Sequence, residues 1–240
     1  MAARLAYPNE SRAYREARNA LLEAEIALRA QIEAVAAQRR ALPAGGEVPE
    51  DYVFERIGAN AMPEKVRMSE LFGPHDTLIL YSFMFGPERE APCPMCANLL
   101  DSMDGGARHL GQRAAFYIVA KSPIARLAAY AHAHGWNHLQ FLSTAGNGYP
   151  ADYFGDTSKL SPEMRRSHGA ADGQDWDETM YNVFRLDDGV IRHFWGSELS
   201  YGPSEPNQDH RSGDATSALW ALLDMTPEGR GQFYPRLSYD

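Results

Sequence analysis

The sequence predicts an α/β protein in which parallel strands of a central sheet are joined by helices. Apolar runs of strand length occupy residues 77–85, 114–120 and 139–142, and helix-forming stretches separate them. An Asp-Gly pair at residues 188–189 joins two further apolar, aromatic-rich runs, a pattern typical of a hairpin. These patterns predict a β-α-β-α-β unit with right-handed crossovers and a mixed sheet that the hairpin completes.

A long helix is predicted from about Asn9 to Arg40, where Ala, Glu, Arg and Leu dominate and Gly and Pro are absent. Its apolar side chains recur every seven residues and form one narrow stripe. The stripe could pack on its own domain, pack against a second subunit in a homodimer, or belong to a flexible tail. It consists of Tyr14, Leu21, Leu28 and Val35, with Ala17, Ala24 and Ile32 beside them.

Pro and Gly are dense over residues 42–49, so a boundary is expected near residue 50. Residues 1–50 would then form a helical arm with its linker, and residues 51–240 the α/β domain. The polar stretch from Thr157 to Glu178 has little periodicity and is interpreted as an insertion, either a lid or partner contact or a disordered loop. A final helix over Ala215–Leu223, capped by Ser212 or Asp214, is expected to cover the sheet.

Both cysteines lie in the stretch Pro92-Cys93-Pro94-Met95-Cys96, after the first central strand and before a helix-forming stretch. Proline is tolerated in a first helical turn because the N–H that it lacks would be unpaired there. Exposed N–H groups and the helix dipole stabilise an anion, so the pKa of Cys93 is expected below that of a free thiol. Cys96, one turn further on, lies on the same side and can resolve a mixed disulfide.

A C-x-x-C beside a β-α-β pattern favours dithiol redox chemistry, with a zinc half-site and inert structural thiols as alternatives. Zinc would need further ligands, and the spacing offers only His134 and His138, with Gly135 between them. We therefore expect no metal and no cofactor. His193, on the second strand of the hairpin, is either a proton carrier near the thiols or a structural histidine.

Composition limits the partners. Lys and Arg number 23 against 32 Asp and Glu, and the net charge of −9 gives no electrostatic support to a nucleic-acid or anionic-membrane partner. No apolar run approaches the roughly 18 to 20 residues of a membrane span, and the first seven residues lack a signal-peptide segment. We expect a reducing cytoplasm, where a lone cysteine pair is reactive, and a thiol or disulfide compound as the substrate.

The order of these pieces resembles the thioredoxin-like superfamily and, more narrowly, the bacterial family of thioredoxin-like proteins known as DUF899. The resemblance implies a three-layer thioredoxin-like fold with a central mixed sheet and an N-terminal helical extension. It also implies a dithiol-disulfide oxidoreductase in which Cys93 attacks and Cys96 resolves, with Pro92, Pro94 and Met95 as supporting residues. The segments that carry it are Tyr7-Pro8, Ser69–Phe72, Phe83–Gly86, Cys93–Cys96, Gly135-Trp136 and Leu222–Arg230.

Two features depart from this pattern. Thioredoxins place a cis-proline opposite the active cysteines, whereas residues 180–184 contain no proline, which weakens the expectation for substrate docking. Peroxiredoxins carry a Thr or Ser shortly before their reactive cysteine, whereas residues 87–92 contain no hydroxyl residue. A thiol peroxidase that uses Cys93 is therefore the second hypothesis. A redox-inactive dimeric binding scaffold, with the long helix and residues 157–178 as contact surfaces, is the third.

Overall fold

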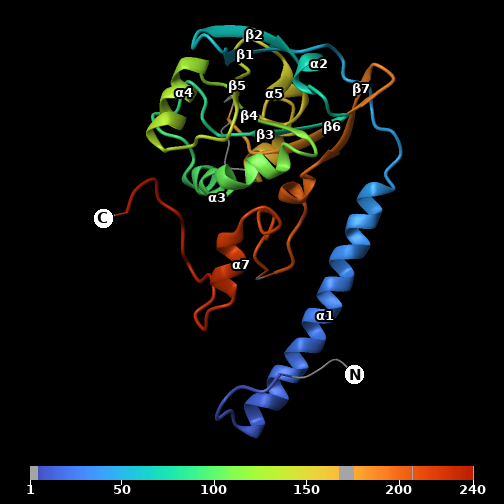
Figure 1. Cartoon of the computed structure of the whole chain (residues 1–240), viewed down its shortest axis with the longest axis vertical. Coiled ribbons are helices and arrows are strands. Elements are labelled where there is room, and N and C mark those ends of the chain that lie inside the picture. The colour runs from blue at the N-terminus through green and yellow to red at the C-terminus, as the bar shows by residue number, and fades with distance from the viewer. Residues whose placement is uncertain (1–4, 168–175, 207, 240) are drawn as a thin grey trace. The chain divides into compact units, whose positions relative to one another are not determined.

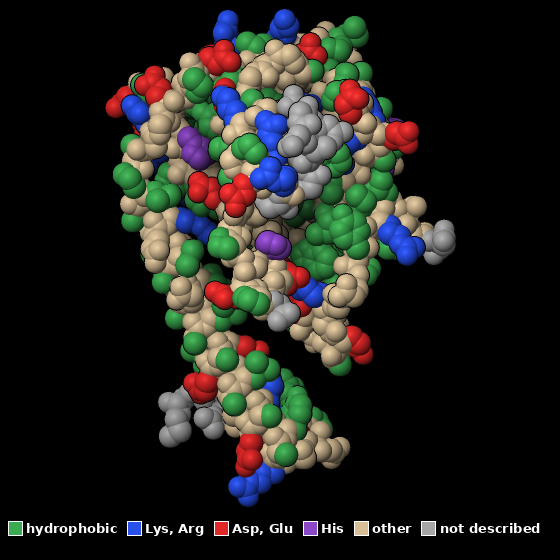
Figure 2. All heavy atoms as spheres, turned by 180° about the vertical axis from the view of Figure 1, so that it is seen from behind, with side chains coloured by type: hydrophobic (Ala, Val, Ile, Leu, Met, Phe, Trp, Pro, Cys, Tyr) green, Lys and Arg blue, Asp and Glu red, His purple; other side chains and the backbone are tan. Residues whose placement is uncertain are grey.

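The structure is a computed structural model that describes residues 5–167, 176–206 and 208–239. It divides into two units, residues 1–44 and residues 45–240 (Figure 1). The first unit contains helix α1 and the second contains all of the strands. On the face shown in Figure 2, acidic and basic side chains are interspersed among hydrophobic and uncharged ones. Within the described ranges, no helix combines the length and apolar character that a membrane crossing requires.

Helix α1 spans Arg12–Arg40 and confirms the predicted N-terminal helix. The Ser11 side chain begins it by accepting a hydrogen bond of 3.1 Å from the backbone N–H of Tyr14. No residue of α1 is buried. The apolar stripe is therefore exposed, with Leu28 at 61% and Ile32 at 60% exposure.

A seven-stranded mixed sheet with the strand order β2-β1-β5-β4-β3-β6-β7 organises the second unit. Strands β3, β4 and β5 are parallel, while the hairpin β6-β7 and the pair β1-β2 run antiparallel to their neighbours. The predicted parallel unit and mixed sheet are confirmed. The strands are β1 Val53–Ile57, β2 Pro63–Arg67, β3 Thr77–Ser82, β4 Ala115–Ala120, β5 Phe141–Ser143, β6 Tyr181–Asp187 and β7 Val190–Gly196.

Alternation along the strands divides the core between the two faces of the sheet. On β3, Leu78 and Leu80 join one cluster with α2 (Met68–Leu71) and α5 (Tyr149–Asp152). Tyr81 joins the other cluster with α3 (Pro94–Leu110) and α4 (Ile124–Ala133). Figure 1 shows the sheet between these two sets of helices, which is the three-layer thioredoxin-like arrangement that the sequence predicts.

Three elements differ from the sequence prediction. Strand β2 was not predicted, because only Val66 of its five residues is buried and the strand lies at the edge of the sheet. Helix α3 continues through Gly105-Gly106 to Leu110, since two glycines cost only about 1 kcal/mol each relative to alanine. Helix α7 spans Ala218–Asp224 and is preceded by Ser217, so neither Ser212 nor Asp214 caps it.

Helix α7 also does not cover the sheet as predicted. Leu222 is 60% exposed, and Trp220 is the one buried residue of the helix. Trp220 packs against Phe233 instead, with a ring-centre separation of 6.4 Å. The C-terminal residues therefore form a local cluster of their own.

The two ends of the predicted insertion pair with each other. Asp156 and Asp177 form a β-bridge, and the backbone N–H of Thr157 donates to the carbonyl of Trp176 over 2.9 Å. Between these ends lie helix α6 (Pro162–Ser167) and residues 168–175, which are outside the described residues and include His168. The joined ends bring buried acidic residues to the carboxyl ends of the parallel strands.

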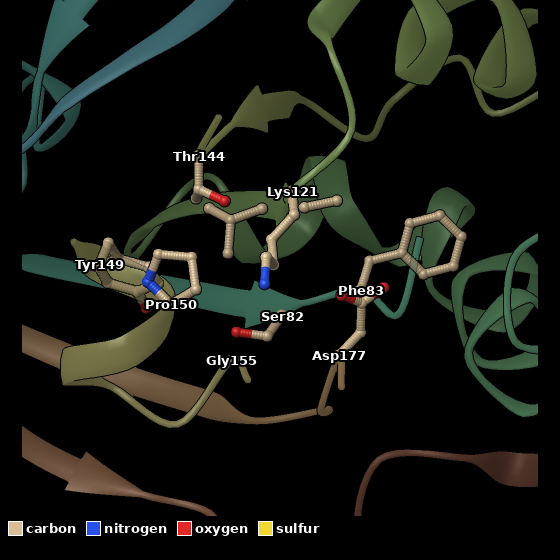
Figure 3. Close-up of a pocket in the computed structure, with 10 residues that line it drawn as sticks. Ser82, Phe83, Lys121, Thr144, Tyr149, Pro150, Gly155 and Asp177 are labelled. Carbon is tan, nitrogen blue, oxygen red and sulfur yellow. The ribbon is translucent and has the colours of Figure 1, made fainter. Parts of the chain in front are cut away.

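A small polar cavity of about 10 Å³ lies at these strand ends (Figure 3). Its lining includes buried hydroxyls of Ser82 and Thr144 that have no hydrogen-bond partner among the described residues. Gly155 approaches so closely that a Cβ atom there would lie 2.9 Å from Ser82 Oγ and 3.3 Å from the Cα atom of Pro150. A side chain at position 155 would therefore crowd both the Ser82 hydroxyl and the Pro150 backbone.

We expect Gly155→Ala to destabilise the protein by about 1–3 kcal/mol, because the added methyl group overpacks this cavity. Chemical denaturation measures the loss. The double variant Ser82→Ala/Gly155→Ala should recover part of it, since removing Ser82 Oγ opens space and breaks no hydrogen bond in the described structure. Equal stability of Gly155→Ala and the wild-type protein would contradict this packing argument.

Candidate dithiol site

Cys93 and Cys96 lie at the start of helix α3, where the sequence predicts them. Cys93 is the N-cap residue with an extended backbone (φ −61°, ψ 125°), and Pro94 is the first helical residue. The backbone N–H of Cys93 donates to the carbonyl of Met84 over 3.0 Å, which ties the site to the segment that leaves β3. Both thiols are reduced, with Cys93 half-buried and Cys96 only 3% exposed.

Several groups stabilise the thiolate form of Cys93. The thiol of Cys96 donates a hydrogen bond to it, and the backbone N–H groups of Met95 and Cys96 add two more. The positive charge of Arg89 acts in the same direction, while burial opposes it. Together these contacts lower the pKa of Cys93 to about 6, as expected for a thiol at a helix N-terminus.

Cys96 has the opposite protonation behaviour. Its hydrogen bond to the Cys93 sulfur, its burial and the charge on Cys93 all raise the pKa of Cys96 above its ordinary value. The hydroxyl of Tyr81 opposes this shift because it can donate to the Cys96 sulfur. Thr179 Oγ1 in turn donates to Tyr81 Oη over 2.9 Å, so a short chain of hydroxyls leads to the buried thiol.

The loop before Cys93 is held by two ionic side chains. Arg126 donates to the carbonyls of Gly86 over 3.2 Å and of Glu90 over 3.1 Å, and lies 4.2 Å from the ring centre of Phe85. Asp177 accepts the Gly86 N–H over 2.5 Å and pairs with Arg89 over 3.1 Å. These bonds position the Arg89 charge beside the Cys93 thiol.

Glu178 is a buried carboxyl group in the same neighbourhood. Burial raises its pKa to about 7, and the negative charges of Cys93 and Asp177 act in the same direction. A carboxyl group that titrates near neutral pH beside a thiolate is suited to accept or donate a proton. Glu178 could not be predicted as a site residue from the sequence, because it lies far from the cysteines in the chain and belongs to no motif.

Tyr234 reaches the site from the C-terminal segment. Burial raises the pKa of Tyr234, and the charge on Cys93 and a hydrogen bond to Cys93 contribute further. Leu237 packs on the same core cluster as both cysteines. Tyr234 thus places a hydroxyl group beside Cys93, and no sequence signal near Cys93 predicts it.

The supporting residues and His193 occupy distinct positions. Pro92 is buried, whereas Pro94 and Met95 are half-buried. His193 lies on the opposite face of the sheet, where its Nε2 is 2.9 Å from Asn182 Oδ1 and its ring stacks on Tyr153. Burial lowers the pKa of His193. This position fits the structural alternative and does not support a proton carrier near the thiols.

Across residues 5–167, 176–206 and 208–239, no group of three or more His, Cys, Asp or Glu side chains is arranged to hold a metal ion. The same residues contain no cis peptide bond.

The chain matches a protein-family model along most of its length. The match covers residues 5–238, and the family is described as "Bacterial protein of unknown function (DUF899)". No curated protein matches the chain.

Several solved structures are similar in fold. Reduced Prx3 from Vibrio vulnificus in complex with H2O2 is 11% identical, with a TM-score of 0.42 over 70% of this chain and 91% of its own. Peroxidoxin BcpB from Mycobacterium tuberculosis is 14% identical, with a TM-score of 0.43 over 76% of this chain and 98% of its own. The exposed lipoprotein thioredoxin Etrx1 from Streptococcus pneumoniae is 13% identical, with a TM-score of 0.35 over 68% of this chain and 96% of its own.

We expect Cys93 to become reactive with iodoacetamide as the pH rises through about 6, where its thiolate forms. Mass spectrometry of the alkylated peptide as a function of pH measures this midpoint. Arg89→Gln and Tyr234→Phe should each raise it, because each removes a group that stabilises the thiolate. His193→Gln is the matched control and should leave it unchanged. A midpoint near that of free cysteine would contradict the lowered pKa of Cys93.

Proposed function

The chain belongs to the DUF899 family of bacterial proteins, and we propose that it is a thiol-disulfide oxidoreductase in which Cys93 attacks and Cys96 resolves. One observation carries the proposal: the two thiols differ in exposure and in protonation. Cys93 is half-buried with its pKa lowered to about 6, whereas Cys96 is buried with its pKa raised. At neutral pH the accessible sulfur is therefore a nucleophilic thiolate, and the buried one retains its proton.

The reaction transfers two electrons from the dithiol to the substrate disulfide. The Cys93 thiolate attacks one substrate sulfur, a mixed disulfide forms, and the other half of the substrate leaves as a thiolate that takes up a proton. Cys96 then loses its proton and attacks the Cys93 sulfur, which releases the second substrate thiol. The protein is left with a Cys93–Cys96 disulfide, and a thiol or dithiol reductant restores the reduced pair.

In the second step Cys96 must lose its proton, so its pKa has to fall after the first step. Once Cys93 is in a mixed disulfide, the negative charge that raised the pKa of Cys96 is gone. The Tyr81 hydroxyl still favours the Cys96 thiolate. Loss of the Cys93 charge also favours ionised Glu178, whose carboxylate then accepts the proton. A reducing compartment such as the cytoplasm suits this cycle.

A thiol peroxidase is the second candidate, and Tyr234 favours it. The hydroxyl of Tyr234 and the guanidinium of Arg89 both act on Cys93, so a hydroxyl and a cation are present beside the thiolate. In that reaction the thiolate attacks a peroxide oxygen, the O–O bond breaks, and Cys93 becomes a sulfenic acid. Cys96 then displaces water from it to form the disulfide.

Variants of the two cysteines test the oxidoreductase proposal. Cys93→Ser should abolish disulfide reduction, whereas Cys96→Ser should still attack once and then accumulate as a mixed disulfide visible by mass. Glu178→Gln should slow the second step by about 100-fold, the range of a general base. Glu163→Gln, an exposed glutamate on α6, is its matched control. Unchanged turnover of Cys93→Ser would refute the proposal.

The oxidant that reacts faster with Cys93 distinguishes a peroxidase from a disulfide oxidoreductase. Reduced protein is mixed with hydrogen peroxide or with a small disulfide, and the Cys93 oxidation rates are compared. Oxidation by peroxide that is faster by orders of magnitude, with a sulfenic acid in Cys96→Ser, would favour the peroxidase. Faster oxidation by the disulfide, with no sulfenic acid, would favour the oxidoreductase.

We also propose that the stripe on α1 packs against a second copy of the chain. The proposal is supported by the exposure of Leu21, Leu28 and Ile32, which repeat at heptad-like spacing along one helix. Paired helices bury such a stripe, and a symmetric homodimer presents the same stripe from both chains.

Deletion of residues 1–42 should convert a dimer into a monomer of the remaining chain, as measured by light scattering of the eluting protein. The full chain should have a mass of twice 26.7 kDa. Leu28→Lys should weaken the dimer, while Ala30→Lys on the opposite side of the helix should not. A full chain that elutes at 26.7 kDa would contradict the homodimer.

A further inference from the structure

A pocket of about 260 Å³ lies beside the dithiol and is formed largely by the C-terminal segment, residues 208–239. It adjoins the attacking thiol through two of its lining residues. Met95 lies between the two cysteines of the C-x-x-C, and Tyr234 contacts Cys93. In Figure 1 this segment and α7 lie on the α3 side of the sheet. The residues that line it include Met95, Asp209, Arg211, Trp220, Arg230 and Tyr234.

Arg230 holds the pocket wall together. Its guanidinium binds Asp209 over 3.2 Å, Asp214 over 2.8 Å and Asp224 over 2.6 Å, and it lies 5.4 Å from the ring centre of Trp220. The Arg230 side chain is only 12% exposed, and all three of its nitrogens donate to these carboxylates. Arg230 is therefore a structural cross-link of the segment.

Arg211 and Asp209, by contrast, retain unused hydrogen-bonding groups. The Arg211 side chain donates to Asp214 and Asp224 through Nη1 alone, so its Nε and Nη2 have no partner among the described residues. Asp209 accepts from Arg230 and from the Arg211 N–H through Oδ1, and its Oδ2 has no partner in the same residues. Both side chains are about half exposed.

The backbone at Arg211 is unusual. Arg211 has a left-handed backbone conformation (φ +48°), which is unfavourable for a residue with a Cβ atom and often marks a functional position. Asp209 Oδ1 accepts the Arg211 N–H over 2.9 Å, so the two residues are joined through the backbone of Arg211. One pocket thus presents a guanidinium donor and a carboxylate acceptor together with the apolar side chains of Met95 and Trp220.

We propose that this pocket binds one half of a small zwitterionic disulfide of the cystine type. The substrate carboxylate would bind Arg211, its ammonium group would bind Asp209, and its sulfur would face Cys93 past Met95 and Tyr234. The proposal rests on the oxidoreductase function above and adds the substrate class. Opposite charges of the pocket match both charges of an amino acid, and a carboxylate bound to a guanidinium is among the stronger hydrogen-bonded pairs.

The protein dithiol supplies both electrons that the reduction of this substrate needs. Cys93 takes one cysteine half into a mixed disulfide and releases the other as a thiol, and Cys96 then releases the bound half as a second thiol. Cystine is reduced to two cysteines while the protein dithiol is oxidised to a disulfide. Added dithiothreitol regenerates the reduced pair in the assay.

Four disulfides test the charge pattern: cystine with both charges, cystamine with the ammonium alone, dithiodipropionate with the carboxylate alone, and hydroxyethyl disulfide with neither. Each rate of oxidation of the reduced full-length protein is divided by the rate of the same disulfide with free dithiothreitol, which removes leaving-group differences. Cystine should then exceed each singly charged compound by about tenfold, the scale of one charge-assisted hydrogen bond.

Variants assign each charge to one residue. Arg211→Gln should slow cystine and dithiodipropionate about tenfold relative to cystamine, and Asp209→Asn should slow cystine and cystamine about tenfold relative to dithiodipropionate. Arg185→Gln, at an exposed ion pair on the hairpin, is the matched control and should change none of these ratios. Equal normalised rates for all four disulfides would overturn the substrate proposal. Absence of reaction with every disulfide would instead refute the oxidoreductase function itself.

Discussion

The site depends on one electrostatic constraint, which is that a single negative charge is shared unequally between two sulfur atoms at the start of α3. The hydrogen bond from Cys96 and the nearby backbone N–H groups stabilise this charge on Cys93 and, for the same reason, keep the proton on Cys96. The sheet makes the arrangement possible because β3 delivers the chain to Met84, whose carbonyl accepts the Cys93 N–H. The remaining features of the site either reinforce this charge or respond to it.

The groups that reinforce this charge or respond to it come from three separate parts of the chain. Arg89 belongs to the loop that Arg126 and Asp177 hold in place, Glu178 follows the insertion, and Tyr234 lies near the C-terminus. Each of these side chains interacts electrostatically with the charge on Cys93. A change in the redox state of the cysteine pair therefore changes these interactions in all three segments. This coupling explains why the C-terminal segment, whose helix α7 packs on its own residues, nevertheless bears on the thiols.

The sequence predicts the framework better than the site. Apolar runs predict β3, β4 and β5, and the positive φ angles of Asp188 and Gly189 show why that pair marks the hairpin. The cysteine pair is recognisable because its two members are three residues apart and start a helix. Glu178 and Tyr234 are not recognisable, because only the folded chain brings them to Cys93. Arg126 is not recognisable either, because only the folded chain brings it to the loop before Cys93. Strand β2 was missed for a related reason, since its residues are mostly exposed and only their pairing with β1 makes them a strand.

The most direct test of the central claim is the reduction potential of the cysteine pair, measured by equilibrating the protein with glutathione redox buffers and counting free thiols by mass. A redox-active pair at a helix N-terminus should give a potential between about −120 and −270 mV, with loss of both thiols together. A pair that stays reduced in every buffer, or a potential below about −300 mV as for structural disulfides, would contradict the account.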